Sequence, residues 1–284
     1  MKKSYEADGL TQYPVGRHLA ALQGPYNRFN VIDESCAAPK DGYGNAESSR
    51  FDLARDGAFQ GLQISVLDLF LGAGVFSCPK DALTEKGFVV HRWEEDSPPS
   101  AGKLAAVLES SCQLWIISGS CAKLGEDHLK VIRAFFDSGR GVYIWGDNDP
   151  FFADANLVAD NLFGGCLSGN VPGDQVVEAR AGDRKIGFEP NHLINRGLKL
   201  LYEGVTVSTV RENALLDPVV YGSGGNLVVA TYDRDGKRAI LDGGFTRLYH
   251  KWDSAGTSRY VRNAAAWLVN YERFGSSMLS RKSK

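Results

Sequence analysis

Between residues 63 and 164 the chain alternates between short apolar runs and longer segments in which apolar and polar positions are mixed. The apolar runs are nearly continuous, as is typical of strands that are covered on both faces of a parallel sheet. In the mixed segments apolar residues recur every three to four positions, which favours amphipathic helices. This pattern predicts buried strands over residues 64–70, 88–93, 114–118 and 141–145.

Polar residues and glycines mark the ends of the helices between these strands. Ser100 precedes one helix as an N-cap, and Gly139 follows another where a C-cap is expected. Asp154 is expected to cap the helix over residues 154–163. The loops are short, so the connections are crossovers that place helices on both faces of the sheet. The predicted fold class is α/β, with a flavodoxin-like parallel sheet.

Beyond residue 170 the pattern becomes rich in strands. The predicted strands cover residues 175–180, 185–188, 205–210, 219–221, 227–232 and 238–241. The first two flank a turn, and residues 233–236 (DRDG) form a hairpin turn. A final helix begins near Thr257. We interpret this part as a strand-rich C-terminal extension of the α/β domain.

The first 60 residues differ from the rest because Gly, Pro, Asn, Asp and Ser are scattered through them without a sustained helical period. We interpret them as an extended N-terminal arm with turns, with disorder as the alternative. Aromatic residues favour an arm that packs on the domain, on a protein partner or on a second copy of the chain in a homo-oligomer. The aromatic residues are Tyr13, Tyr26, Phe29, Tyr43 and Phe51. The expected organisation is an arm over residues 1–60, an α/β domain over residues 61–273 and a polar tail over residues 274–284.

Composition narrows the classes of protein. The formal net charge of −2 argues against a strongly basic nucleic-acid-binding protein. No apolar run approaches the roughly 18–20 residues of a membrane helix, and no signal peptide follows Met1. The chain has 5 cysteines, an odd number, and no C-x-x-C pair. We therefore expect reduced thiols, a cytoplasmic location, and neither a nucleic-acid nor a membrane partner.

Two neighbouring motifs resemble a known family. Residues 113–120 (QLWIISGS) and 139–147 (GRGVYIWGD) are similar to the centre of the class I glutamine amidotransferase-like superfamily. More narrowly, they resemble its non-catalytic branch in gliding-motility and intraflagellar-transport proteins. Residues 191–198 (NHLINRGL), 236–245 (GKRAILDGGF) and 259–268 (RYVRNAAAWL) resemble later segments of that branch. The resemblance covers about residues 62–270.

The resemblance also implies what this chain lacks. Active members carry a cysteine on a sharp turn after the fourth strand, and a His and a Glu after a later strand. Here the corresponding residues are 146–150 (GDNDP) and 242–247 (DGGFTR), which contain neither the nucleophile nor its partners. The resemblance therefore implies a catalytically degenerate domain without glutaminase activity. Such a domain would act as a protein-interaction or ligand-sensing module.

Cys121 is a candidate nucleophile because it follows the third strand, and His128 is nearby as a candidate base. A nucleophile elbow passes directly from strand to helix, whereas Cys121 lies several residues before the next helix. We therefore interpret it as an ordinary thiol, and a Cys121-dependent hydrolase remains an alternative.

Polar residues are most dense beside the end of the fourth strand. Open parallel sheets bind ligands at the carboxyl ends of their strands. The candidate ligand-binding residues are Asp147, Asn148, Asp149, Asp242 and Arg247.

These carboxylates leave a second function open, a hydrolase or lyase that uses an acidic crevice. No cofactor is predicted, but Asp147 and Asp149 are candidate ligands of Mg²⁺ or Ca²⁺, which prefer oxygen atoms. Asp68, at the end of the first strand, could face the same crevice. The alternative is structural, with residues 147–150 shaping a tight turn.

Overall fold

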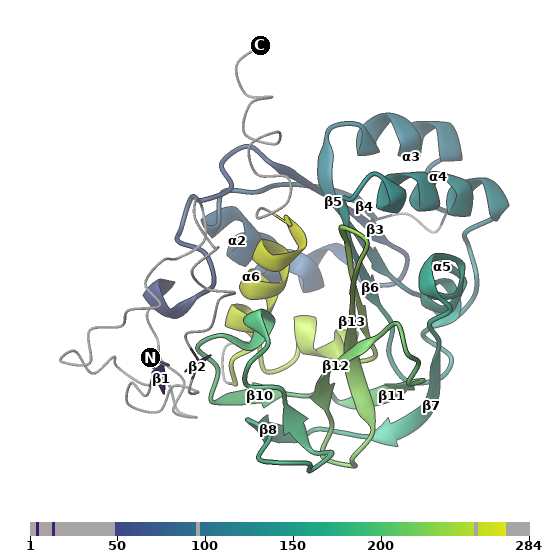
Figure 1. The fold of residues 1–284 in the computed structure, drawn as a ribbon. Helices are drawn as coiled ribbons and strands as arrows, with labels where there is room; N and C mark the ends of the chain where they lie inside the picture. Colours follow the sequence, from purple (N-terminus) through teal and green to yellow (C-terminus); the bar gives the residue numbers. More distant parts are fainter. Residues whose placement is uncertain (1–3, 6–12, 15–48, 95–96, 253–254, 271–284) are drawn as a thin grey trace.

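The computed structural model describes residues 4–5, 13–14, 49–94, 97–252 and 255–270. Its centre is an eight-stranded sheet with the order β4-β3-β5-β6-β14-β13-β12-β9 (Figure 1). The first five strands in this order are parallel, and the last three join by antiparallel pairing. The mostly parallel sheet confirms an α/β fold.

The four strands predicted in the first half of the chain are confirmed as a parallel unit. They are β3 (Gln63–Asp68), β4 (Val89–Glu94), β5 (Ser111–Ile117) and β6 (Gly141–Trp145). All residues of β5 and β6 are buried, which explains their near-continuous apolar sequence. β4 pairs with one edge of β3, and β5 pairs with the other edge and is followed by β6. This order is consistent with a flavodoxin-like sheet.

Helices cover both faces of the sheet, as predicted. One face carries α2 (Ser77–Glu85) and α6 (Thr257–Leu268), which pack on each other. The other face carries α3 (Ala101–Leu108), α4 (Glu126–Asp137) and α5 (Ala153–Phe163), as Figure 1 shows. The expected N-cap of α3 is present, because Ser100 Oγ accepts from the Lys103 amide at 3.4 Å.

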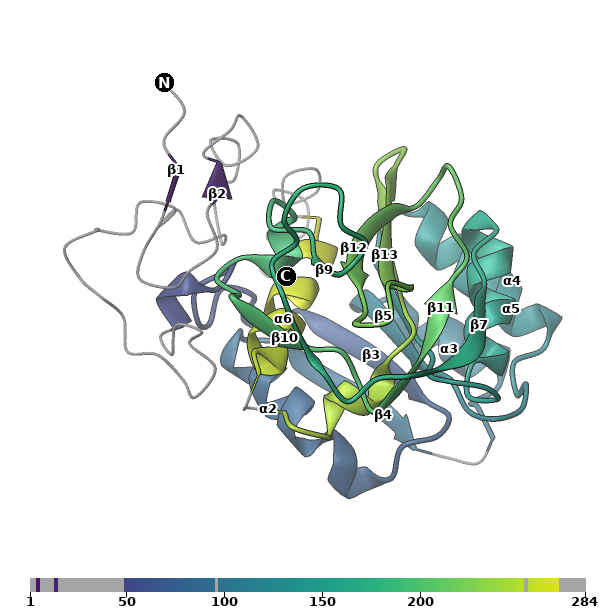
Figure 2. The same cartoon turned by 90° about the horizontal axis from the view of Figure 1, so that it is seen from below.

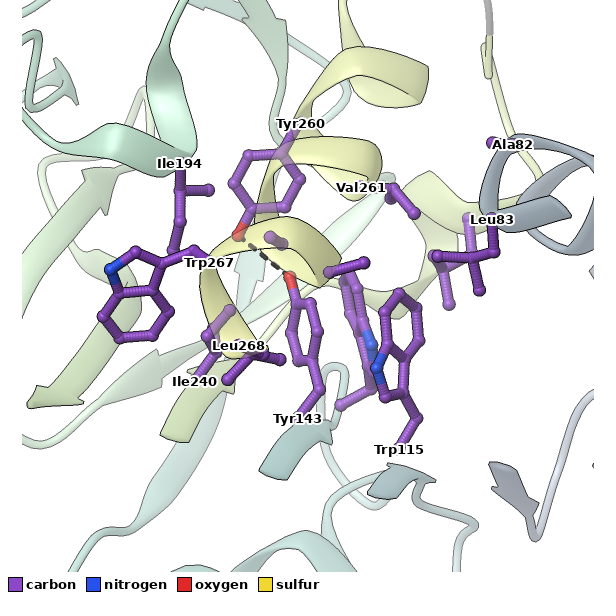
Figure 3. Packing of buried hydrophobic residues seen from close by; sticks show 14 of the residues in the cluster. Ala82, Leu83, Trp115, Tyr143, Ile194, Ile240, Tyr260, Val261, Trp267 and Leu268 are labelled. Carbon is purple, nitrogen blue, oxygen red and sulfur yellow. Dashed lines mark hydrogen bonds between the residues drawn. The ribbon is translucent and has the colours of Figure 1, made fainter. Parts of the chain in front are cut away.

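Alternate residues of the central strands supply two separate cores. On β5, Trp115 and Ile117 point toward α2 and α6, whereas Leu114 and Ile116 belong to the core under α3, α4 and α5. Figure 3 shows the first of these cores, with α6 lying over β6. Gly141 permits this approach, since a Cβ there would lie 2.4 Å from the Leu268 carbonyl oxygen.

The later strands follow the prediction at one end of the sheet. β12 (Asp217–Tyr221), β13 (Leu227–Arg234) and β14 (Lys237–Asp242) form an antiparallel meander. The predicted hairpin turn joins β13 to β14, with Asp235 and Gly236 at φ angles of 51° and 77°. Both values are those of a type I′ turn, which matches the twist of the strands.

Two strands in the same region, β7 and β10, were not predicted from the sequence. β7 (Leu167–Pro172) pairs with β11 (Thr206–Val210), and β10 (Leu200–Tyr202) pairs with β8 (Val176–Glu178). The turn expected between residues 175–180 and 185–188 is present at residues 182–183, and beside it the Arg180 amide donates to the Phe188 carbonyl oxygen at 2.7 Å. β9 (Gly187–Phe188) pairs with β12. Most of β7 is exposed, so its sequence lacks the apolar pattern of a strand.

Most of the predicted arm and the whole polar tail lie outside the described residues. Residues 49–59 are described, and they pack into the core under α6. The Leu53 amide donates to Asn263 Oδ1 at 2.7 Å, and Asp52 pairs with Lys86 at 2.8 Å and with Arg259 at 2.7 Å. No helix in the described part of the chain is long and apolar enough to cross a membrane.

Candidate functional site

The fold brings the ends of β6 and β14 together at the carboxyl edge of the sheet. The two strands are parallel neighbours, with Trp145 opposite Asp242. β6 continues into Asp147, and β14 continues into the 3-10 turn η4 (Phe245–Leu248). Asp147 therefore lies near Asp242 and Arg247, although about 100 residues separate them in the sequence.

Asp147 is buried, with 1% of its surface exposed. Its Oδ1 accepts from the Asn148 amide and its Oδ2 from the Thr246 amide, both at 2.9 Å. Burial raises the pKa of Asp147 to about 7, although both amides and the nearby Arg247 act in the opposite direction. Its carboxyl group thus ties the loop after β6 to η4.

Asp242 is the centre of a buried group of hydroxyls. Tyr143 and Tyr260 each donate to its Oδ2 at 3.0 Å, and the Gly244 amide donates to its Oδ1 at 3.0 Å. The two hydroxyl oxygens are themselves 3.0 Å apart, as the dashed line in Figure 3 shows. Burial raises the pKa of Asp242, and Arg247 and the two tyrosines oppose that rise.

Arg247 supplies the positive charge of this group. Its guanidinium lies 3.3 Å from both oxygens of Asp242 and donates to the Glu203 carbonyl oxygen at 2.8 Å. It also lies over the ring of Tyr260, 5.4 Å from the centroid. A buried charge persists only when it is paired and hydrogen-bonded, and these contacts meet that requirement. The site is therefore a closed polar core at the place where an open crevice was expected.

The other two ligand candidates lie at the surface of the same loop. Asn148 Oδ1 accepts from the Thr206 hydroxyl at 2.7 Å, which ties the loop to β11. Asp149 is exposed, and its amide donates to the Gly169 carbonyl oxygen of β7 at 3.0 Å. The peptide bond between Asp149 and Pro150 is cis. Asp149 lies in a tight turn, as expected if residues 147–150 have a structural role instead of a ligand-binding one.

Asp68 does not converge on this group. It ends β3, which β5 separates from β6, and it forms an ion pair with Arg92. Its Oδ1 also accepts from the amides of Phe70 and Leu71. Among the described residues no group of three or more His, Cys, Asp or Glu side chains could hold a metal ion.

The predicted cap of α5 is wrong. Ser118, at the end of β5, accepts from the amides of Asp154 and Ala155 at 3.0 and 3.2 Å. The Asp154 carboxylate instead accepts from the amides of Lys123 and Leu124 at 2.8 and 2.9 Å. Asp154 is close in sequence to the first turn of α5. Ser118 is far from it in sequence and lies beside that turn only because β5 and β6 are neighbours in the sheet.

Cys121 is exposed, but His128 is not placed to activate it. The Nδ1 of His128 accepts from the Gly125 amide at 3.2 Å, and its Nε2 lies 2.8 Å from the Pro99 carbonyl oxygen. Both ring nitrogens are therefore used within the start of α4 and the loop before α3. Nucleophilic catalysis needs a base within hydrogen-bond reach of the thiol, and this geometry does not supply one through His128.

Tyr143 and Tyr260 are the residues of this site that sequence reasoning missed. Each was assigned to a buried strand or helix on apolar spacing, although a buried phenolic hydroxyl needs a partner. The sequence therefore indicated that each hydroxyl would have a hydrogen-bond partner. It did not indicate that the partner would be Asp242.

An aromatic cluster covers the same edge of the sheet. The ring of Phe70 lies 4.8 Å from that of Phe151 and 5.3 Å from that of Phe245, measured between centroids. These residues follow β3, β6 and β14 respectively. Phe70 is 45% exposed, and Tyr249, which follows η4, is 40% exposed. The carboxyl edge therefore presents aromatic side chains to solvent above a closed polar core.

No protein-family model matches this chain, and no curated protein matches it. Among solved structures it is similar to a GMP synthase component from Thermoplasma acidophilum, at 11% identity and a TM-score of 0.44, over 78% of this chain and 98% of that one. It is also similar to PurLQS from Thermotoga maritima, at 11% identity and a TM-score of 0.39, over 75% and 99% of the chains.

A third similar structure is the exo-β-1,4-mannosidase Op5Man5 from Opitutaceae bacterium strain TAV5. The identity is 10% and the TM-score is 0.43, over 74% of this chain and 36% of that one. These similarities are distant.

Proposed function

We propose that this protein is a catalytically degenerate amidotransferase-like domain that acts as a protein-interaction or ligand-sensing module. One observation carries the proposal. Asp147 follows β6, where active members of the superfamily that the motifs resemble carry their cysteine, and its carboxyl group is buried against two main-chain amides. An aspartate held in this way cannot be approached by a substrate carbonyl.

The second half of the expected catalytic machinery is also replaced. The segment after β14 carries Asp242 and Arg247 in place of the His and Glu of active members, and both side chains are fully buried in an ion pair. Acyl transfer needs a nucleophile, a base and an oxyanion site around one accessible point. The closed carboxylate–guanidinium pair supports a domain that holds its shape at this edge instead of performing chemistry there.

The aromatic cluster supports the binding role. Phe70 and Tyr249 are large and partly exposed, and Phe70 packs on Phe151 and Phe245. Aromatic side chains are enriched at interaction surfaces, so the exposed rings of Phe70 and Tyr249 support a binding role. A reducing, cytoplasmic location, expected from the odd number of cysteines, belongs to the same proposal.

The hydrolase or lyase alternative receives less support from the geometry. The two oxygens of Asp147 already accept hydrogen bonds from amides, and Asp242 is neutralised by Arg247. A divalent cation at Asp147 and Asp149 would compete with the amides of Asn148 and Thr246 for the Asp147 oxygens.

The test of the proposed function is release of ammonia from glutamine by the purified protein, with an active glutaminase assayed in parallel as positive control. We expect no release above the rate without enzyme. Turnover that disappears in Cys121→Ala, or in Asp147→Asn, would show that the domain is an enzyme and would overturn the proposal.

A further inference from the structure

A hollow of about 420 Å³ lies between α5, α4, the two residues before β7 and the residue after β11. Figure 2 shows β7 and β11 side by side near α4 and α5. Its lining includes Leu129, Leu157, Asp160, Asn161, Cys166 and Arg211. None of them belongs to the buried group around Asp242. The volume falls in the range of about 300–1,000 Å³ that is typical of small-molecule sites.

Main-chain contacts fix the walls of this hollow. Asn156 of α5 bonds both polar groups of Leu167, with its Nδ2 2.9 Å from the Leu167 carbonyl oxygen and its Oδ1 2.7 Å from the amide. The Arg211 amide donates to the Cys166 carbonyl oxygen at 2.9 Å. The main chain at Arg211 is therefore fixed beside the residues that follow α5.

One face of α5 supplies both apolar and acidic groups. Leu157, Asp160 and Asn161 are three and four positions apart, so they lie on the same side of the helix. Leu157 is 37% exposed, and Leu129 of α4 lines the hollow beside it. The two leucine side chains together form an apolar wall of the hollow.

Opposite charges line the same hollow without meeting. Asp160 and Arg211 are both exposed, and among the described residues neither forms an ion pair within 4 Å. A guanidinium binds a carboxylate through two parallel hydrogen bonds. A carboxylate such as that of Asp160 accepts from an ammonium group. A ligand that carries both charges would therefore satisfy both side chains at once.

We propose that this hollow binds a free aliphatic α-amino acid. The ligand carboxylate lies on Arg211, its ammonium group on Asp160, and its alkyl side chain between Leu129 and Leu157. The site is apart from the carboxyl edge, so the inference goes beyond the function proposed above. A result on glutaminase activity does not decide it.

The test is isothermal titration of the full chain with L-leucine, L-isoleucine, L-valine and L-methionine. We expect at least one to bind. The binding should weaken about tenfold or more in Arg211→Gln, which removes the two parallel bonds of the guanidinium, and in Asp160→Asn, which removes the negative charge opposite the ammonium group. The matched controls are Arg184→Gln and Asp183→Asn, which change the same residue types at exposed positions outside the hollow. These controls should bind as the wild type does.

Ligand analogues test each charge separately. 4-Methylpentanoate lacks the ammonium group of leucine and 3-methylbutylamine lacks its carboxylate, and each should bind about tenfold more weakly than leucine. Circular dichroism of every variant verifies the fold. The proposal is overturned if none of the four amino acids produces heat, if Arg211→Gln binds as tightly as the wild type, or if either analogue equals leucine.

Discussion

Arg247 and Asp242 form an ion pair in which neither side chain has exposed surface, with Nη2 and Oδ1 3.3 Å apart. Nη1 lies at the same distance from Oδ2, so the contact is bidentate. The carboxylate also accepts from two tyrosine hydroxyls, which offsets the loss of water around it. The end of β14 is thus held by electrostatics inside the core, at the edge where parallel sheets commonly bind ligands.

Replacing the arginine should destabilise the fold strongly. Arg247→Met leaves the buried Asp242 charge without its partner, and we expect a loss of about 3–5 kcal/mol in the free energy of unfolding. Urea denaturation measures this loss. Arg184→Met, at an exposed position, should stay within about 0.5 kcal/mol of the wild type. The double variant Arg247→Met with Asp242→Asn should recover part of the loss. A single-variant loss under about 1 kcal/mol would contradict the role of the pair.

The two tyrosine hydroxyls should each contribute measurably. Tyr143→Phe and Tyr260→Phe remove one donor to Asp242, and each should cost about 1–3 kcal/mol of unfolding free energy, because the acceptor is charged and buried. Tyr232→Phe is the matched control, since Tyr232 is buried in the core on the opposite face of the sheet, away from Asp242. If all three variants lose equal stability, the bonds to Asp242 contribute nothing specific.

Asp147 should give stability a distinct dependence on pH. Its pKa is about 7 in the folded chain against 3.8 for the ordinary carboxyl group. Between these values the folded state holds the proton more tightly than the unfolded state, so the Asp147 contribution to stability falls as pH rises from about 4 to about 7. Each unit of pKa difference corresponds to about 1.4 kcal/mol. Arg247 and Tyr249 are the charged and titratable groups that act on it.

The measurement is the unfolding free energy of the wild type and of Asp147→Asn at several pH values in this window. We expect the unfolding free energy of the wild type to fall relative to that of the variant as pH rises. Other groups titrate in both proteins and cancel in the difference. A constant difference across the window would show that the Asp147 pKa is not raised.

A divalent cation should not find a site at the loop after β6. Both oxygens of Asp147 accept from amides, and Asp149 lies on an exposed turn. Calorimetric titration with Mg²⁺ or Ca²⁺ should therefore give no heat for the wild type or for Asp147→Asn with Asp149→Asn. Heat in the wild type that disappears in the double variant would restore the metal hypothesis.

Two truncations test the boundary of the arm. Removing residues 1–60 deletes Leu53 and Phe59, which are buried in the core with α6, and the buried Phe51, so we expect aggregation. Removing residues 1–48 keeps these side chains and the bond from Leu53 to Asn263. Size-exclusion chromatography compares the two. Equal solubility and stability of both truncated proteins would contradict a structural role for residues 49–59.

The sequence alone determined those features that depend on local pattern. β5 and β6 were predictable because strands buried on both faces are nearly continuous in apolar residues. The turn at Asp235 and Gly236 was predictable because few residues adopt positive φ angles. Ser100 was a predictable cap because it bonds the amide of Lys103, only three residues away.

The partners of the buried polar groups depend on the tertiary structure. Asp147 meets Thr246, and Asp242 meets Tyr143, because β14 inserts beside β6 after a long excursion of the chain. Ser118 caps α5 in place of Asp154 for the same kind of reason. Hydrophobic periodicity records which side of an element is buried, but it carries no information about which element lies opposite. The partner of a buried polar group depends on strand order, and strand order is a property of the whole chain.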